Sequence, residues 1–187
     1  TIGNSLLSSV FTNSSILLNS GLNLNLGITA QHFSLNYNYS IEPRIALIKN
    51  LGENHTLGLA YGLHSRIESL NIYFNNSLIS GEKAVNKNLD FTKSHHLVFS
   101  YDWSISDLLH LKIEPYFQFL YEVPVIDNSS FSAINIQSDW FFAEKMVNKG
   151  KGRNYGLDLT FEKYMSNGFY FISTASIFNA KYKGGDN

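Results

Sequence analysis

The residues of this sequence best suited to chemistry are its histidines, and the closest pair is His95-His96. Two imidazoles bind a transition metal only when they converge on one ion. The residues around the pair alternate between apolar and polar, which indicates an extended strand, and neighbouring residues of a strand point to opposite faces. We therefore predict no metal site here, with one histidine on each face of a strand.

A row of polar side chains that includes two carboxylates follows further along the chain. Its members are His110, Lys112, Glu114, Gln118 and Glu122. Paired carboxylates could act as general acid and base, but mixed charge along a water-filled wall explains the row without catalysis. Nothing in the sequence resembles a nucleophile elbow, a phosphate-binding loop or a dinucleotide fingerprint. We therefore expect neither an enzyme nor a bound cofactor.

The polar row lies on the second of two long strands in the stretch from Ser94 to Val123, with a short turn at residues 105–107. The other face of that second strand is apolar: Leu109, Leu111, Ile113, Pro115, Phe117, Phe119 and Tyr121. Such a stripe is long enough for a tilted transmembrane strand, which needs about 9–11 residues. A sheet with an apolar outside and a polar inside is typical of an outer-membrane β-barrel.

The composition agrees with a membrane sheet. Of the 187 residues 44% are hydrophobic and 14% aromatic, but only 16% are charged, against about 25% in soluble domains. No apolar run approaches the roughly 18 residues of a transmembrane helix. The net charge of -1 gives no argument for nucleic acid as a partner. The absence of cysteine excludes disulfides and thiolate metal sites.

Alternation of apolar and polar residues predicts six further strands. They are Asn4–Phe11, Ser15–His32, Ile41–Lys49, Thr56–His64, Asn154–Lys163 and Phe169–Tyr182. Short turns at residues 12–14, 51–54, 105–107 and 166–168 alternate with longer links at 33–40, 65–93 and 124–148. This alternation predicts an antiparallel transmembrane β-barrel segment of about eight meandering strands, with short periplasmic turns and long extracellular loops. Because proline deletes a backbone donor, we expect a bulge or irregular pairing at Pro43 and Pro115.

The barrel hypothesis assigns roles to three groups of side chains. We expect a polar group to face the lumen: Glu42, Arg44, His64, Lys112, Glu114, Gln118, Glu122 and Asp158. Aromatic side chains in the long loops either contact a ligand or partner or pack the loops together: Tyr73, Phe74, Phe131, Trp140, Phe141 and Phe142. Aromatic residues near strand ends are candidates for interfacial girdles: Trp103, Tyr164 and Tyr170 by short turns, and Tyr121, Tyr155 and Tyr182 by long loops. The stretch from Phe169 to Tyr182 is apolar on both faces, so its pattern assigns no inside.

Several long stretches resemble the barrel portion of TonB-dependent outer-membrane receptors, in the class with a carboxypeptidase-regulatory-like domain. These stretches are SIEPRIAL (40–47), LAYGLHS (59–65), LDFTKSHHLVFSYDWSISDLLHLKIEPYFQFLYEVPV (89–125) and VNKGKGRNYGLDLTFEKYMSNGFYFISTASIFNAKYKG (147–184). The resemblance implies a 22-stranded barrel in the bacterial outer membrane, closed by an N-terminal plug, that takes up a scarce ligand with energy delivered through TonB. Ligands in the family include iron chelates, cobalamin, glycans and peptides. The resemblance carries over no ligand-binding residue.

The resemblance also implies partners and a larger protein. The partners are outer-membrane lipid, TonB through an N-terminal region, a small-molecule or oligomeric ligand, and a surface lipoprotein. The sequence holds neither a plug nor a TonB-contacting box. We therefore expect residues 1–187 to be an internal piece of one outer-membrane barrel domain that supplies about eight strands of its wall.

Two other architectures fit the same alternation. A self-contained eight-stranded barrel would serve a structural or adhesive role, and it requires pairing between the first and last strands. A secreted antiparallel β-sandwich would bind glycans through exposed aromatic residues, and it requires the apolar side of the sheet to pack on a second layer.

Overall fold

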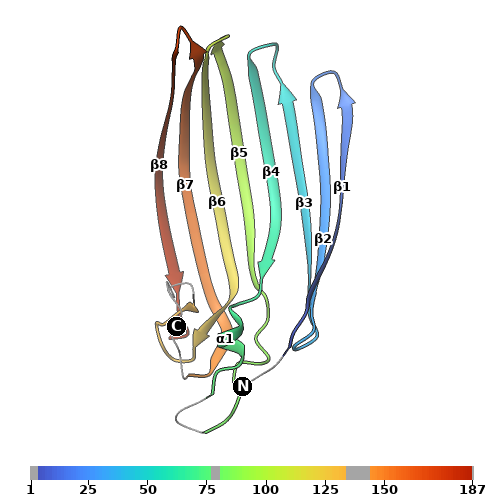
Figure 1. Cartoon of the computed structure of the whole chain (residues 1–187), viewed down its shortest axis with the longest axis vertical. Helices are drawn as coiled ribbons and strands as arrows, with labels where there is room; N and C mark the ends of the chain where they lie inside the picture. The colour runs from blue at the N-terminus through green and yellow to red at the C-terminus, as the bar shows by residue number, and fades with distance from the viewer. Residues whose placement is uncertain (1–3, 77–80, 134–143, 187) are drawn as a thin grey trace.

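The computed structural model describes residues 4–76, 81–133 and 144–186. Eight strands form one antiparallel sheet in chain order, each hydrogen-bonded to the next (Figure 1). The strands are β1 (Leu7–Asn19), β2 (Leu22–Phe33), β3 (Asn38–Asn50), β4 (His55–Arg66), β5 (Thr92–Ser106), β6 (Leu109–Ile126), β7 (Met146–Ser166) and β8 (Phe169–Lys183). The predicted all-β fold with eight meandering strands is confirmed. Within the described ranges the one helix, α1 (Leu70–Tyr73), is far too short to cross a membrane.

Connections between strands gather at two opposite ends of the sheet (Figure 1). At one end, here called the hairpin end, β1–β2, β3–β4, β5–β6 and β7–β8 are joined by tight turns. At the other, the loop end, residues 67–91 join β4 to β5 and residues 127–145 join β6 to β7. The predicted turn at 51–54 and those close to residues 107 and 167 are confirmed, as are the two longest links.

The first predicted turn is wrong, because residues 12–14 lie inside β1 and the chain turns at Ser20-Gly21. Gly21 adopts a φ of +83°, a conformation that glycine reaches without steric cost. The leucines on both sides of this turn occupy even positions, so the alternation continues in phase through it. That continuity is why the sequence predicted one strand over Ser15–His32 where the structure has parts of two.

The link expected over residues 33–40 is also shorter than predicted. It is a turn of residues 34–37, and the polar residues after it already belong to β3. Tyr37 completes the turn with a φ of +59°. The strict alternation of short turns and long links therefore fails at this connection.

Both prolines interrupt hydrogen-bonded pairing on one side only. Pro43 lies opposite Ile28 in the regular β2–β3 ladder, whereas the β3–β4 ladder begins only at Arg44. Pro115 lies opposite Leu157 in the β6–β7 ladder, whereas the β5–β6 pairing has a gap at its level without a change of register. Irregular pairing at both prolines is confirmed, and neither has a bulge.

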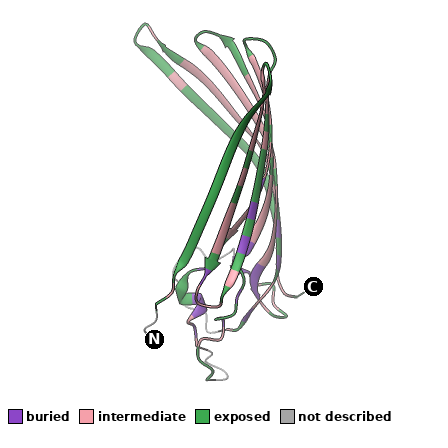
Figure 2. Ribbon diagram, turned by 90° about the vertical axis from the view of Figure 1, so that its right-hand side faces the viewer, coloured by how far each residue is buried: buried purple, intermediate pink, exposed green. Residues whose placement is uncertain are grey.

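Register assigns a face to every strand, because directly opposed residues of an antiparallel sheet lie on the same side. One side, the apolar face, includes Leu26, Ile45, Leu59, Phe99 and Phe117, all of them exposed. The other side, the polar face, carries the polar row of β6 and its neighbours. Among the described residues no second layer covers the apolar face, and strands pack on their sheet neighbours (Figures 1 and 2). This is the inverse of a soluble sheet, and residues 4–76, 81–133 and 144–186 form no sandwich.

The apolar face has the height of a membrane. On β6 the stripe from Leu109 to Phe119 covers ten residue steps, or about 33 Å along a strand. At a tilt of about 40° this corresponds to roughly 25 Å along the membrane normal, the height of the apolar band of outer-membrane barrels.

The buried hydrophobic core lies at the loop end instead of across the sheet (Figure 2). Its residues are Phe33, Ile72, Tyr73, Leu89, Phe91 and Met146. The ring of Tyr73, on α1, meets that of Phe33 edge to face at 5.2 Å between centroids. Desolvation by burial raises the pKa of Tyr73 to about 12. The core therefore fastens the long loops to the ends of the strands.

Register also separates the candidate girdle aromatics. Trp103, Tyr121 and Tyr155 lie on the apolar face, opposite Leu111, Lys93 and Phe117 respectively. Two others depart from the expected girdles: Tyr164 stacks on His110 of the polar row, and Tyr182 lies opposite Gly152 on the polar face. On β8, whose inside the sequence could not assign, the polar face receives Ile172, Thr174, Ser176, Phe178, Ala180 and Tyr182.

Candidate functional site

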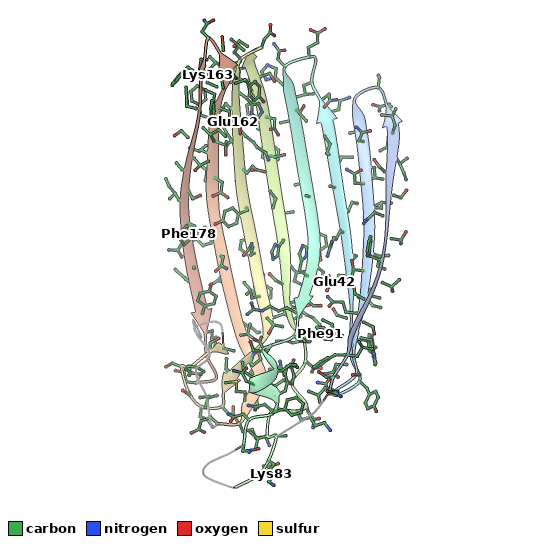
Figure 3. All side chains as sticks on the ribbon, viewed as in Figure 1. Glu42, Lys83, Phe91, Glu162, Lys163 and Phe178 are labelled. Carbon is green, nitrogen blue, oxygen red and sulfur yellow. The ribbon has the colours of Figure 1, made fainter. Side chains whose placement is uncertain are left out.

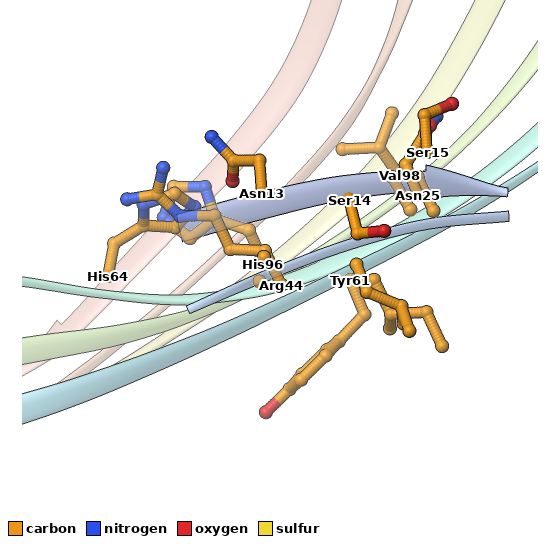
Figure 4. A pocket seen from close by; sticks show the side chains of 15 residues that line it. Asn13, Ser14, Ser15, Asn25, Arg44, Tyr61, His64, His96 and Val98 are labelled. Carbon is orange, nitrogen blue, oxygen red and sulfur yellow. The ribbon is translucent and has the colours of Figure 1, made fainter. Parts of the chain in front are cut away.

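The polar face carries a hollow of about 540 Å³ over β1 to β5 (Figure 4). Its floor consists of small residues on neighbouring strands: Gly27, Ala46, Ala60 and Gly62. Longer polar side chains surround the floor: Asn13, Asn25, Arg44, His64 and His96. The hollow exists because four adjacent positions lack a side chain larger than methyl while their neighbours project.

Arg44 is held at the hollow by a buried carboxylate. Its Nη2 lies 3.2 Å from Oε2 of Glu42, and Glu42 is only 2% exposed. Oε1 of Glu42 accepts hydrogen bonds from the Ser65 backbone N–H at 3.1 Å, from Ser65 Oγ at 2.5 Å and from Gln31 Nε2. These donors occupy the gap where the β3–β4 ladder stops at Pro43, and Figure 3 shows Glu42 toward the loop end of the sheet. The carboxylate therefore replaces the missing ladder and orients Arg44.

Two imidazoles lie beside the guanidinium group. The rings of His64 and His96 are 4.6 Å apart between centroids, and His96 Nδ1 lies 3.5 Å from Gln118 Nε2. His95 lies on the apolar face, where its Nδ1 is 2.8 Å from the hydroxyl of Tyr61. The prediction that His95 and His96 diverge is confirmed. In the described part of the chain, no group of three or more metal-ligating side chains occurs.

A second polar region follows toward the hairpin end on β5 to β8. Nε2 of His110 lies 3.3 Å from Asp102 Oδ1, and Nζ of Lys112 lies 2.8 Å from Glu114 Oε1. Ser176 Oγ donates to Asp158 Oδ1 at 2.7 Å. Lys112 lies opposite Asp102 and His110 opposite Glu162, whereas Glu114 lies directly opposite Asp158, so carboxylates outnumber basic groups here. This region forms a wet wall and offers no isolated acid–base pair.

The structure brings seven of the eight expected lumen residues to the polar face, and Glu122 is the exception. The β6–β7 ladder changes register after Leu120, and Glu122 has a φ of +54°. This irregularity directs its carboxylate to Lys93, at 2.7 Å between Oε2 and Nζ. Lys93 lies opposite Tyr121 on the apolar face. Glu122 thus leaves the polar row, and the even spacing from Glu114 to Glu122 could not reveal this.

The loop aromatics that the structure describes belong to the core at the loop end or pack on it. Tyr73 is 0% exposed, and Phe74 and Phe131 pack on the core at the loop end. In this arrangement Tyr73 cannot offer its ring to a ligand, and the packing alternative fits these three residues. Trp140, Phe141 and Phe142 lie outside the described residues.

Sequence reasoning missed several residues of the hollow. Asn13 was assigned to a turn, and the sequence singled out neither Asn25 nor the glycines. Their grouping depends on register: Gly27 pairs with Arg44, which pairs with Gly62, which pairs with His96. Alternation along single strands gives the face of a residue but not its cross-strand neighbours.

Solved structures of outer-membrane transporters have the same fold. The siderophore receptor PirA from Pseudomonas aeruginosa matches 94% of this chain with a TM-score of 0.72 and 15% identity. The FrpB iron transporter from Neisseria meningitidis matches 95% with a TM-score of 0.68 and 10% identity. The RagAB peptide importer matches 94% with a TM-score of 0.67 and 14% identity. The chain covers 32%, 26% and 22% of these three structures respectively, so it spans a third of their length or less.

Neither a protein-family model nor a curated protein matches the chain. The fold is nevertheless specific: eight consecutive antiparallel strands, one exposed apolar face and one polar face. The chain has the fold of a segment of the wall of an outer-membrane receptor barrel.

Proposed function

We propose that this chain supplies eight strands of the wall of a TonB-dependent receptor in the bacterial outer membrane, with its polar face toward the transport lumen. The observation that carries the proposal is the open sheet itself. Its apolar face is uncovered over about the height of a bilayer, and the first and last strands, β1 and β8, are not paired in the described part of the chain. A barrel of eight strands would have joined them, so further strands of a larger barrel would complete this wall.

The proposed role of the hollow is to contact a ligand inside the barrel. Arg44 is anchored by a buried carboxylate and keeps 45% of its side chain exposed, while His64, His96 and two asparagine amides surround it. Guanidinium, imidazole and amide groups donate hydrogen bonds. This lining suits a ligand rich in oxygen acceptors, which agrees with transport and requires no catalysis.

Binding of TonB tests the proposal without knowledge of the ligand. The full-length protein, purified from outer membranes in detergent, is mixed with the purified periplasmic domain of TonB. We expect a complex that disappears when the N-terminal segment of the full-length protein is deleted. Recovery of the protein in the soluble fraction, or an absence of binding to TonB, would contradict the proposal.

A further inference from the structure

Four basic side chains gather on the apolar face at the loop end of β7 and β8. They are Lys151, Arg153, Lys181 and Lys183, here called the cation quartet. Lys151 lies opposite Lys183, and Arg153 lies opposite Lys181. Arg153 is also opposite Phe119 of the apolar stripe, which places the quartet on the side that the stripe occupies.

The quartet is compact and lacks counter-charges. Opposed residues of an antiparallel pair lie about 5 Å apart, and residues two apart on one strand are separated by about 7 Å. All four are exposed, and none has an ion pair with another described residue, whereas nearby Lys149 pairs with Asp127 at 2.9 Å. Like charges directly opposite one another destabilise a sheet. An external anion would remove this repulsion.

Along both strands, the apolar-face side chains change from aliphatic to polar or aromatic and then to basic toward the loop end. On the apolar face of β7, Leu159 and Leu157 are followed by Tyr155 and then by Arg153. On β8, Ile177 is followed by Asn179 and Lys181. Tyrosine favours the interface between membrane and water. The quartet therefore lies one step beyond the apolar band, at the level of lipid headgroups.

We propose that the cation quartet binds an outer-leaflet lipid whose headgroup carries at least two phosphate groups. The guanidinium of Arg153 can hold one phosphate through two parallel hydrogen bonds, and the lysines supply point charges around it. The acyl chains of that lipid would lie along the apolar faces of β7 and β8. The site rests on the proposed function, in which lipid covers the apolar face, and on the expectation from the sequence that the long loops are extracellular; it lies on the opposite face from the hollow.

Lipid binding by the full-length protein in detergent micelles tests the proposal. Native mass spectrometry measures binding of diphosphoryl lipid A, of its fully dephosphorylated form and of inorganic pyrophosphate. Each cation near anionic headgroups contributes about 1 kcal/mol, so the R153Q/K181Q variant should bind diphosphoryl lipid A about 30-fold more weakly. The dephosphorylated lipid should bind equally weakly to both proteins.

A charge-matched variant supplies the control. K83Q/K87Q removes two exposed lysines from the long loop at the same end of the sheet, and it should bind as the unaltered protein does. The R153K variant keeps all four charges but loses the paired hydrogen bonds of the guanidinium, so its affinity should lie between those of the unaltered protein and R153Q/K181Q. Equal binding by R153Q/K181Q and K83Q/K87Q, or pyrophosphate binding as tight as that of the lipid, would overturn the proposal. Binding of TonB should be unaffected in every variant, so the two proposals can fail separately.

Discussion

Replacement of Glu42 by alanine should destabilise the sheet more than replacement of its ion-pair partner Arg44. The Glu42 carboxylate is 2% exposed and accepts from three donors at Oε1 and from Arg44 at Oε2. The β3–β4 ladder is absent at this level, so the Ser65 backbone N–H has no strand carbonyl to replace the carboxylate. E42A would leave these donors without an acceptor in a largely buried gap.

The structure gives an order of magnitude for each change. E42A leaves three donors in the buried gap without an acceptor, at about 1–3 kcal/mol for each, so we expect a loss of about 3 kcal/mol or more. E42Q keeps an oxygen at the Oε1 position and should lose about 1 kcal/mol, since only the contact with Arg44 changes. The Arg44 side chain is 45% exposed, so solvent screens part of its attraction to Glu42. R44A also leaves the buried carboxylate without its cation but with its three other donors, and we expect a loss of about 1.5 kcal/mol, the low end for a hydrogen bond to a charged group.

Guanidinium unfolding of the full-length protein in lipid vesicles measures these differences. Hydrogen exchange at the Ser65 amide gives a local reading, and it should become faster in E42A but not in R44A. If E42A and R44A destabilise the protein equally, or if exchange at Ser65 is unchanged, the carboxylate does not replace the ladder at Pro43.

Three further changes test other parts of the fold. L159R should destabilise the barrel in vesicles by about 2–4 kcal/mol in guanidinium unfolding, because it puts a charge on the lipid side, and T160R on the polar face should cost under about 1 kcal/mol. Y73F removes a hydroxyl that accepts from the Glu68 backbone N–H at 3.3 Å and should loosen the loop-end core by about 1 kcal/mol, measured as faster limited proteolysis. Burial raises the pKa of Tyr73 to about 12, whereas a tyrosine in the unfolded chain has a pKa of about 10. The stability contributed by the protonated Tyr73 hydroxyl is therefore complete below about pH 10 and is lost as the pH rises from 10 toward 12. Y73F should lack this pH dependence. G156A should cost about 1–3 kcal/mol by the same unfolding assay, because a Cβ would lie 2.7 Å from a backbone carbonyl oxygen of β8.

Alternation of apolar and polar residues predicted the strands, their faces and the membrane setting, because side-chain direction along a strand depends only on period two. The first turn was predicted at the wrong residues, because the two-residue turn at Ser20-Gly21 keeps the alternating leucines in phase on both sides of it. The interruption at Pro43 was predictable from the missing donor. The carboxylate that fills it was not, because Glu42 and Ser65 are separated by 23 residues.

The candidate site was predicted only in part. Arg44 and His64 were expected on the polar face, but the hollow depends on cross-strand register, which sequence alternation does not specify. Glu122 was misplaced because a local change of register after Leu120 moved its carboxylate to Lys93. The cation quartet likewise becomes visible only when β7 and β8 are aligned.

Single cysteines at Leu111 and Lys112 test most directly whether lipid covers one face of this sheet and water the other. The two residues are neighbours on β6, and the structure places them on the apolar and polar faces respectively. A membrane-impermeant thiol reagent is applied to the full-length protein in outer-membrane vesicles, under conditions in which the reagent reaches the lumen of the barrel. We expect rapid labelling of the cysteine at 112 and almost none at 111. Comparable labelling at both positions would contradict the membrane orientation and the transport role that depends on it.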